Sequence, residues 1–354
     1  MDSVLEKFRQ RIHAATIEQK PLCIQGSGSK IWYGQDAQGE IFDTREYRGI
    51  IAYEPTELVI TARCGTPLAE IEAALDLQHQ MFAFEPPHFG IASTIGGVVA
   101  AGLSGPRRAT AGAMRDFVLG ASLMDGRGAV LNFGGQVMKN VAGYDVSRLL
   151  AGSMGCLGLL LDVSIKVLPK PRAETTLAFA FSESDAIQRM NTWAGQALPI
   201  SASAWQVGRL MLRLSGAEAA VRAAKQKLGG EEVANANTYW AAIREQQHDF
   251  FAQDEEHGLW RMSLPSTSPA LRLNGKTLIE WGGAQRWLFS DEKVHTIRDL
   301  VGQAGGHLTL FRGGERSGDI FTPLSRPLHK IHQNLKNSFD PSGIFNPGRM
   351  YPDL

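Results

Sequence analysis

The sequence predicts an α+β protein with more than one domain. A chain of 354 residues is longer than a single hydrophobic core normally serves. Short apolar runs typical of strands alternate with amphipathic helical segments, and four glycine-dense turns crowd residues 84–160. Beyond Pro169-Lys170-Pro171 the glycine density falls, and this change indicates a domain boundary.

The composition excludes several classes of partner. The chain carries 36 basic and 36 acidic residues, with no Lys/Arg-rich run, so it lacks the electrostatic footprint of a nucleic-acid or anionic-lipid binder. Cys23, Cys64 and Cys156 are too few and too widely spaced for a disulfide framework, and there is no Cys-x-x-Cys pair to hold zinc or an iron–sulfur cluster. We therefore expect no metal site and a reducing, cytoplasmic compartment.

The N-terminus gives no sign of export. The stretch MDSVLEKFRQRIHAAT mixes charges throughout, which predicts an amphipathic helix rather than a signal peptide. The longest uncharged apolar run, residues 149–161, is shorter than the ~20 residues of a spanning helix. We expect no transmembrane segment, and any contact with the inner membrane to be peripheral and made through partners.

The first strand is expected at residues 21–24 and ends in a polar, flexible loop, QGSGSK, with one positive charge. This loop either grips an anion or is only a turn after a strand. A second strand, 59–62, is followed by a turn at Gly65. Thr66 then caps a helix that opens with Pro67 and buries one apolar stripe.

A second glycine turn, ASTIGG, follows a stiff Pro86-Pro87 pair. Its two glycines and two hydroxyls predict successive amides turned inward, as in the concave N–H nests that bind pyrophosphate, with positive φ at Gly96. Two such loops could hold one diphosphate. Neither a G-x-G-x-x-G dinucleotide fingerprint between strand and helix nor a G-x-x-x-x-G-K-[ST] phosphate loop is present, which disfavours those two folds.

The ordered motifs GSGSK, EPPHFG, ASTIGG, GPRR, MRDFVLG, KNVAGYD, GSMGCLG and DPSGIFNPGR resemble the FAD-binding domain of the vanillyl-alcohol oxidase and p-cresol methylhydroxylase (PCMH) superfamily. Together with LWRMSLP, WGGAQRW and FNPGRMY, they resemble over nearly the full length the E-subunit family of bacterial glycolate oxidase. The resemblance implies a PCMH-type FAD-binding domain of two α+β subdomains at residues 1–172. It also implies an inserted antiparallel, ferredoxin-like α+β cap at 173–314 and a segment at 315–354 that returns to the FAD domain.

The resemblance carries the cofactor site onto residues of this chain. The expected FAD-binding residues are Gln25, Gly26, Ser27, Gly28, Ser29, Lys30, Pro86, Pro87, Gly90, Ser93, Thr94, Ile95, Gly96, Gly97, Gly155, Leu157, Gly158, Leu160 and Asn346. In relatives with covalent flavin the anchor is often a histidine of the first glycine loop. Here that loop is GSGSK, so we expect non-covalent FAD.

The roles of other polar residues near these turns are less specifically predicted. We expect His88 to be solvated or hydrogen-bonded rather than catalytic. Arg107, Arg108 and Arg115 could pair with phosphate, but Asp116 offers an internal ion pair as the simpler explanation. The turn with Lys139, Asn140, Gly143 and Asp145 is implied to lie near the flavin.

The rest of the chain alternates strands and helices. Strands are expected at 159–167, 176–181, 210–214, 260–264, 278–289 and 307–311, and helices at 182–195, 217–228, 238–251 and 291–304. A last helix opens at Pro327, with Leu328, Ile331, Leu335 and Phe339 on one stripe.

Oxidation of a 2-hydroxy acid needs a cation for the carboxylate and a base for the hydroxyl proton. Arg261 is the candidate cation and His307 the candidate base, although such residues are more often a snorkelled, structural arginine and a structural histidine. Catalytic relatives, including the companion D subunit, carry an H-x-H-x-G-D-G-N motif in the cap. This chain has no H-x-H, which puts turnover by the isolated chain in doubt.

The resemblance implies an FAD-binding subunit of a glycolate-oxidising complex that forms glyoxylate and passes electrons to a partner. The expected partners are a second flavoprotein subunit and an iron–sulfur subunit, because three scattered cysteines cannot hold a cluster. Two alternatives remain open. One is a non-catalytic assembly subunit with a vestigial flavin site, and the other is a stand-alone flavin oxidase of another 2-hydroxy acid.

Overall fold

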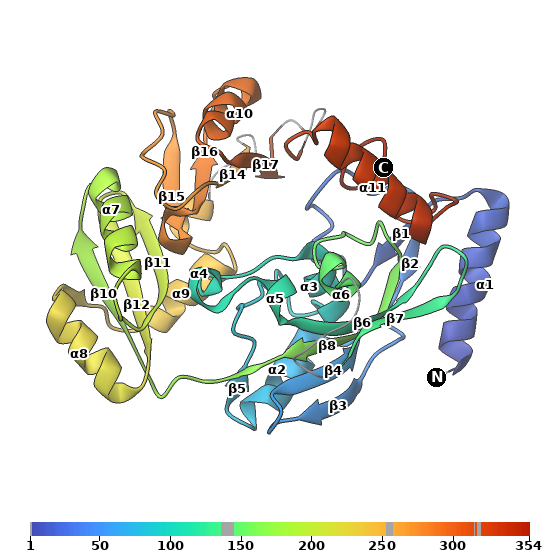
Figure 1. The fold of residues 1–354 in the computed structure, drawn as a ribbon, viewed down its shortest axis with the longest axis horizontal. Helices are drawn as coiled ribbons and strands as arrows, with labels where there is room; N and C mark the ends of the chain where they lie inside the picture. Colours follow the sequence, from blue (N-terminus) through green and yellow to red (C-terminus); the bar gives the residue numbers. More distant parts are fainter. Residues whose placement is uncertain (1, 136–144, 253–257, 315, 317–319) are drawn as a thin grey trace.

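The computed structural model describes residues 2–135, 145–252, 258–314, 316 and 320–354. Two lobes, each built around its own antiparallel sheet, lie side by side (Figure 1). The N-terminal lobe contains a five-stranded sheet, and the cap lobe contains an eight-stranded sheet. The C-terminal helix returns from the cap lobe to the side of the N-terminal lobe where the chain begins.

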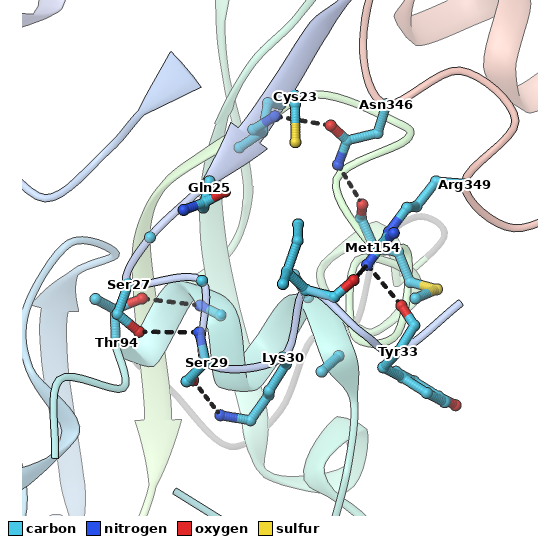
Figure 2. Close-up of a pocket in the computed structure, with 17 residues that line it drawn as sticks. Cys23, Gln25, Ser27, Ser29, Lys30, Tyr33, Thr94, Met154, Asn346 and Arg349 are labelled. Carbon is cyan, nitrogen blue, oxygen red and sulfur yellow. Dashed lines mark hydrogen bonds between the residues drawn. The ribbon is translucent and has the colours of Figure 1, made fainter. Parts of the chain in front are cut away.

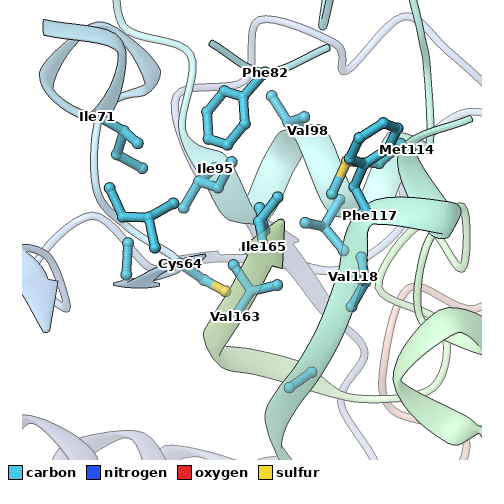
Figure 3. Packing of buried hydrophobic residues seen from close by; sticks show 14 of the residues in the cluster. Cys64, Ile71, Phe82, Ile95, Val98, Met114, Phe117, Val118, Val163 and Ile165 are labelled. Carbon is cyan, nitrogen blue, oxygen red and sulfur yellow. The ribbon is translucent and has the colours of Figure 1, made fainter. Parts of the chain in front are cut away.

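The five-stranded sheet has the order β3-β4-β8-β6-β7, and all of its pairs are antiparallel. Its strands are β3 (Ile50–Glu54), β4 (Val59–Arg63), β6 (Val118–Met124), β7 (Val130–Gly134) and β8 (Leu159–Lys166). Helices α2 (Leu68–Asp76) and α3 (Ile95–Ala101) contribute the other half of a core that includes Ile71, Ile95 and Val163 (Figure 3). Because this core fixes α3 against β4, the loop before α3 is held in one position.

The first strand lies outside that sheet. β1 (Leu22–Gln25) pairs in parallel with β2 (Glu40–Asp43), while α1 (Asp2–Glu18) packs its apolar stripe, including Phe8 and Ile12, against them. On its other side, β1 pairs with the C-terminal segment through an isolated bridge between Leu22 and Phe345. Both ends of the chain therefore support the loop that follows β1.

The cap sheet consists of two similar halves. The first has the order β13-β10-β12-β11 and the connection strand–helix–strand–strand–helix–strand, which is the ferredoxin-like arrangement. Its elements are β10 (Ala173–Ala180), α7 (Glu183–Ala194), β11 (Ile200–Gln206), β12 (Arg209–Gly216), α8 (Glu218–Leu228) and β13 (Glu231–Glu232).

The second half has the mirrored strand order β15-β16-β14-β17 and joins the first through the antiparallel pair β11–β15. Its elements are β14 (Leu259–Ser263), β15 (Lys276–Glu280), the 3-10 turn η2 (Trp281–Gly283), β16 (Gln285–Phe289), α10 (Val294–Gln303) and β17 (His307–Arg312). A loop without helix or strand at 264–275 stands where the first half has α7. The two halves form one continuous sheet that faces the N-terminal lobe.

Short elements complete the described chain. They are α4 (Arg108–Ala111), α5 (Met114–Phe117), α6 (Val146–Leu149), α9 (Ala236–Arg244), η1 (Asp249–Phe251), α11 (Arg326–Phe339), β5 (Gln80–Met81) and β9 (Leu168–Pro169). None of the described helices is long and apolar enough to cross a membrane.

Three sequence predictions of elements are wrong in detail, and a fourth feature, the apolar stripe of α11, is less buried than a core-facing stripe would be. The Thr66 cap expected for α2 is absent, because Pro67 is the N-cap. The expected single strand 278–289 is a hairpin, because Gly282 and Gly283 take positive φ of 66° and 105° and turn the chain. The expected helix 238–251 ends at Arg244, and only a 3-10 turn follows. The apolar stripe of α11 is partly uncovered, with Leu328 48% and Ile331 52% exposed, whereas its Lys336 is buried.

Candidate functional site

A pocket opens between the loop after β1, the start of α3 and the C-terminal segment, with a volume of about 90 Å³. We call it the loop pocket. Figure 2 shows Ser27, Ser29, Lys30 and Thr94 on one side of it and Asn346, Met154 and Arg349 on the other. Nine expected site residues line it, namely Gln25, Gly26, Ser27, Gly28, Ser29, Lys30, Thr94, Gly97 and Asn346.

The loop at residues 26–30 presents free backbone donors. The N–H groups of Gly26, Ser27, Gly28 and Lys30 have no hydrogen-bond acceptor within the described residues. Gly28 lies at φ +75°, where a side chain would be strained and would also meet the Gln25 amide at 2.8 Å. Unpaired amides in successive turn residues form a concave anion-binding surface. The free amides thus lie in this loop, whereas the sequence predicted the nest at the ASTIGG turn.

Lys30 adds a positive charge beside these amides. Its Nζ donates to Ser93 Oγ at 2.8 Å and to the His88 carbonyl at 3.0 Å, so it joins the two loops. Burial lowers the pKa of Lys30 to about 8, while the Glu245 carboxylate acts in the opposite direction. A neighbouring anion would restore the full charge of the ammonium group.

The second loop does not form the expected nest. The Ile95 and Gly96 N–H groups donate to the carbonyls of Thr66 and Cys64, and the Gly97 N–H donates to Thr94 Oγ1 at 3.3 Å. These three N–H groups already have acceptors within the protein, so they are not available to an anion. Thr94 is instead the N-cap of α3, a role that its hydroxyl suits well.

Gly96 is required for a different reason from the one expected. It does not have positive φ within α3, and a Cβ there would lie 2.7 Å from both the Cβ and the carbonyl oxygen of Cys64. Gly96 therefore permits close packing of α3 on β4. Its neighbour Gly97 faces the loop pocket, where a Cβ would meet only Thr94 Oγ1 at 3.3 Å.

Asn346 ties three segments together at the rim of the loop pocket. Its Oδ1 accepts from the Ile24 N–H at 2.7 Å, and its Nδ2 donates to the Met154 carbonyl at 2.6 Å. Gly155 makes room for it, because a Cβ there would lie 2.6 Å from Asn346 Nδ2. Arg349, which the sequence reasoning missed although it ends the FNPGR motif, donates to the carbonyls of Ile31 and Tyr33 and lines the same pocket.

The other expected cofactor residues do not line the loop pocket. Ser93 contacts the pocket residue Lys30 by accepting its hydrogen bond, and Gly155 leaves the space that the pocket residue Asn346 occupies. Ile95, Leu157 and Leu160 contribute to the core of the N-terminal lobe, while Gly158 lies against the Met124 carbonyl. Pro86 is buried, Gly90 is exposed, and Pro87 lines a second pocket.

The second pocket, which we call the interlobe pocket, lies between the N-terminal and cap lobes and has a volume of about 30 Å³. Arg261, the candidate cation of the sequence analysis, lines it and donates from Nη2 to the Tyr33 hydroxyl at 3.0 Å. Tyr33 itself lines the loop pocket, so the two pockets adjoin at this contact. His307 does not line either pocket and lies at the exposed start of β17.

The sequence reasoning missed Glu280, which lines the interlobe pocket and is 3% exposed. Its Oε2 accepts from Trp287 Nε1 at 2.6 Å and from Gln285 Nε2 at 3.1 Å. Burial raises the pKa of Glu280 to about 7, and these two hydrogen bonds oppose the rise. A glutamate at the end of a strand carries no sequence signal for such burial, since it is set by the packing around β15.

The basic residues near the glycine turns contact other residues of the chain. Arg107 is buried and bonds to Glu85 and Glu174, so its expected ion pair forms with partners other than Asp116. Arg108 lies over the Trp281 ring at 4.4 Å. His88 Nε2 lies 3.1 Å from a Glu72 carboxylate oxygen, in keeping with its expected hydrogen-bonded role. Residues 139, 140 and 143 lie outside the described residues.

Comparison with known proteins relates this geometry to a family. Residues 5–134 match a family described as an FAD binding domain. The glycolate oxidase subunit GlcE of Escherichia coli (strain K12) is 50% identical over 345 residues, which cover 98% of this chain and 97% of that protein. The glycolate oxidase subunit GlcD of Bacillus subtilis (strain 168) is 29% identical over 168 residues, or 47% of this chain and 36% of that protein.

Among solved structures, an alkyldihydroxyacetonephosphate synthase matches 97% of this chain and 75% of its own with a TM-score of 0.66 at 13% identity. This likeness concerns the fold, and together with the domain match it confirms the predicted fold class. The identity to GlcE extends over both lobes and nearly the full length of both chains. On that ground, the chain belongs to the family of the glycolate oxidase subunit GlcE.

Proposed function

We propose that this chain is an FAD-binding subunit of a glycolate oxidase or dehydrogenase complex, which oxidises glycolate to glyoxylate and passes the electrons to a partner subunit. The observation that carries this proposal is the loop at 26–30, whose unpaired amides and Lys30 line a pocket within the matched FAD binding domain. Family membership adds the substrate, because the relative named for glycolate oxidation covers nearly the whole chain.

The residues of the loop pocket suit FAD. The amides of residues 26–30 and the Lys30 ammonium favour the diphosphate. Ala100, Ala101 and Met154 provide an apolar wall for the uncharged parts of the cofactor. Both kinds of surface occur in one pocket of about 90 Å³, which suits the diphosphate of FAD and the uncharged atoms next to it rather than the whole cofactor.

We propose that FAD is held non-covalently. No histidine lines the loop pocket within the described residues. Cys23 lines it, but burial raises the pKa of its thiol, and a protonated thiol is a poor nucleophile. The expected result is FAD that is released when the protein is denatured with acid.

When bound, FAD supplies the two-electron acceptor that oxidation of an alcohol to a carbonyl requires. The chain's own residues bind and orient it. Lys30 and the loop amides would hold the central diphosphate, and Asn346 holds β1 and the turn at Met154 together around the pocket. Residues 1–172 and 315–354 form the FAD-binding part in this proposal, and residues 173–314 form the cap.

We propose two partners, a second flavoprotein subunit and an iron–sulfur subunit. The three cysteines of this chain are all buried, and within the described residues no cluster of His, Cys, Asp or Glu suits a metal ion. An electron relay built on cysteine thiolates would therefore reside in another polypeptide. A soluble subunit that reaches the inner membrane face only through such partners is consistent with the helices described.

Flavin content and reconstituted turnover test the proposal. The purified chain should carry FAD or bind it with a thermal shift, and glycolate turnover with an artificial acceptor should require the partner subunits. A colourless chain that ignores excess FAD would favour the assembly-subunit alternative. Glycolate turnover by this chain alone, with peroxide as product, would favour the stand-alone oxidase and refute the complex.

A further inference from the structure

We propose that the interlobe pocket binds a small 2-hydroxy carboxylate, with Arg261 taking the carboxylate and Glu280 Oε1 forming a hydrogen bond with the hydroxyl, as acceptor when ionised and as donor when protonated. This inference rests on the proposed function and assigns substrate contacts to this chain rather than to a partner alone. Four separate features of the pocket support it: an unmatched cation, a free carboxylate oxygen, an unpaired amide oxygen and the size of the cavity.

Arg261 is the unmatched cation. Within the described residues its only hydrogen bond goes to the Tyr33 hydroxyl, and its guanidinium lies over the Phe311 ring at 5.4 Å. Arg244, the other arginine of the pocket, is already paired with Glu245 at 2.7 Å. A cation enclosed by aromatic rings favours an anionic ligand, and the planar guanidinium fits a carboxylate in particular.

Glu280 offers an acceptor. Both of its recorded hydrogen bonds end on Oε2, which leaves Oε1 without a donor within the described residues. The Trp287 and Gln285 donors hold the carboxyl group in place, so Oε1 has a fixed position at the pocket wall. A carboxyl group whose pKa is near 7 can also exchange a proton with a bound hydroxyl near neutral pH.

Gln246 provides the independent sign of a ligand. Its side chain lines the same pocket, is 9% exposed, and carries an Oε1 that is buried without a hydrogen-bond partner within the described residues. A buried acceptor left unpaired loses its hydrogen bonds to water without replacement, so native proteins rarely retain one. With a turn of the amide toward the cavity, a ligand hydroxyl or a ligand-bound water would supply the missing donor.

The cavity selects by size. Its volume of about 30 Å³ is small, which disfavours bulky 2-hydroxy acids and leaves the smallest, which still need the pocket side chains to move slightly apart. The contact between Arg261 and Tyr33 places such a ligand next to the loop pocket proposed for FAD. The pocket thus combines charge, acceptors and position for glycolate.

The pH dependence of binding follows from the charges around Glu280. Glu85 is an anion near Glu280 and is itself paired with Arg107 and Arg213. Two cations, Arg244 and Arg261, line the same pocket as Glu280. The phenol of Tyr239 also lies near Glu280. A bound carboxylate adds negative charge, so it favours the protonated form of Glu280. Glycolate should therefore bind more weakly as pH rises from 6 to 8.

Calorimetric titration of the full-length chain with glycolate and acetate tests the inference. Glycolate should bind at least tenfold more tightly than acetate, which lacks the hydroxyl, and its Kd should rise severalfold from pH 6 to pH 8. Glu280→Gln keeps the size of the side chain and should abolish the pH dependence. Arg261→Met should abolish binding of both acids. The control is Arg209→Met, because Arg209 forms an exposed ion pair with Glu231, and this variant should leave the affinity for both acids unchanged.

Equal binding of both acids, or glycolate binding that survives Arg261→Met, would overturn the inference. Arg261→Lys is the control for loss of binding through misfolding. It keeps the positive charge, so it should bind both acids more weakly than the wild type while its circular dichroism spectrum stays unchanged. The proposed function and this inference can fail independently. A chain that binds FAD but not glycolate would support the proposed FAD-binding function and refute the substrate site. A chain that binds glycolate but not FAD would support the substrate site and refute the FAD-binding function.

Discussion

Arg261 and Tyr33 are joined by a hydrogen bond of 3.0 Å between Nη2 and the phenol oxygen, although 228 positions separate them in the sequence. The bond connects β14 of the cap lobe to the segment after the glycine loop of the N-terminal lobe. Tyr33→Phe removes the acceptor and keeps the ring. Because hydrogen bonds to charged groups are worth roughly 1.5–3 kcal/mol, we expect a stability loss of about that size in urea unfolding.

A double-mutant cycle with Arg261→Met separates this bond from the packing of the ring. The two losses should be less than additive, since either change alone removes the same bond. Strict additivity would show that Arg261 and Tyr33 do not interact in solution.

Adjacent glycines of α3 should respond in opposite ways. Gly97→Val places a side chain in the loop pocket, where its Cβ meets only Thr94 Oγ1, so we expect FAD to be lost from a folded chain. Gly96→Ala forces a Cβ against the backbone of Cys64 and should destabilise the fold by about 1–3 kcal/mol. Flavin absorbance and thermal melting measure the two effects. Flavin-replete Gly97→Val protein would place the cofactor elsewhere.

FAD affinity should fall as pH rises through about 8. The charged form of Lys30 attracts the diphosphate, and below its pKa of about 8 that form is already present. Above that pH, binding must take up a proton, so Kd should rise by up to about tenfold per pH unit. Lys30→Met should bind FAD more weakly at pH 7 and lose this dependence. A titration from pH 6.5 to 9.5 that is flat in the wild type would contradict the role of Lys30.

Lys336 is expected to be a structural cation. It is buried in α11 and donates to the Asp340 carboxylate at 2.8 Å and to the carbonyls of Cys156 and Phe345. Lys336→Met leaves the fully buried Asp340 without its countercharge, and the loss should be about 3–5 kcal/mol in denaturant unfolding. Lys330→Met on the same helix provides the control and should be nearly neutral.

The local parts of the site could be predicted from the sequence, and the parts that depend on packing could not. The loop at 26–30 was accessible because glycine and serine specify a turn with free amides. The resemblance supplied Asn346. The role of Gly96 was mistaken, since its partner Cys64 lies in the turn after β4, 32 positions earlier, and no local pattern reveals that contact. The turn at Gly282-Gly283 was visible as a glycine pair and was overlooked.

Glu280 and Gln246 could not have been found from sequence spacing. One ends a cap strand and the other follows α9, and only the folded sheet brings both to the interlobe pocket. Polar residues at the ends of elements are usually solvated, so burial has to be observed before a role can be assigned.

The burial of Glu280 makes stability depend on pH in a predictable direction. Its folded pKa of about 7 lies above the ordinary glutamate value of 4.5, so between these pH values the folded chain binds more protons than the unfolded chain. The contribution of Glu280 is therefore fully present below pH 4.5 and is lost as pH rises through 7. From pH 5 to pH 8 the loss should approach about 3 kcal/mol, at 1.36 kcal/mol per unit. Glu280→Gln cannot titrate and should flatten this part of the stability profile, measured by urea unfolding at each pH. If wild type and variant lose stability in parallel across that range, the carboxyl group titrates as an ordinary exposed glutamate.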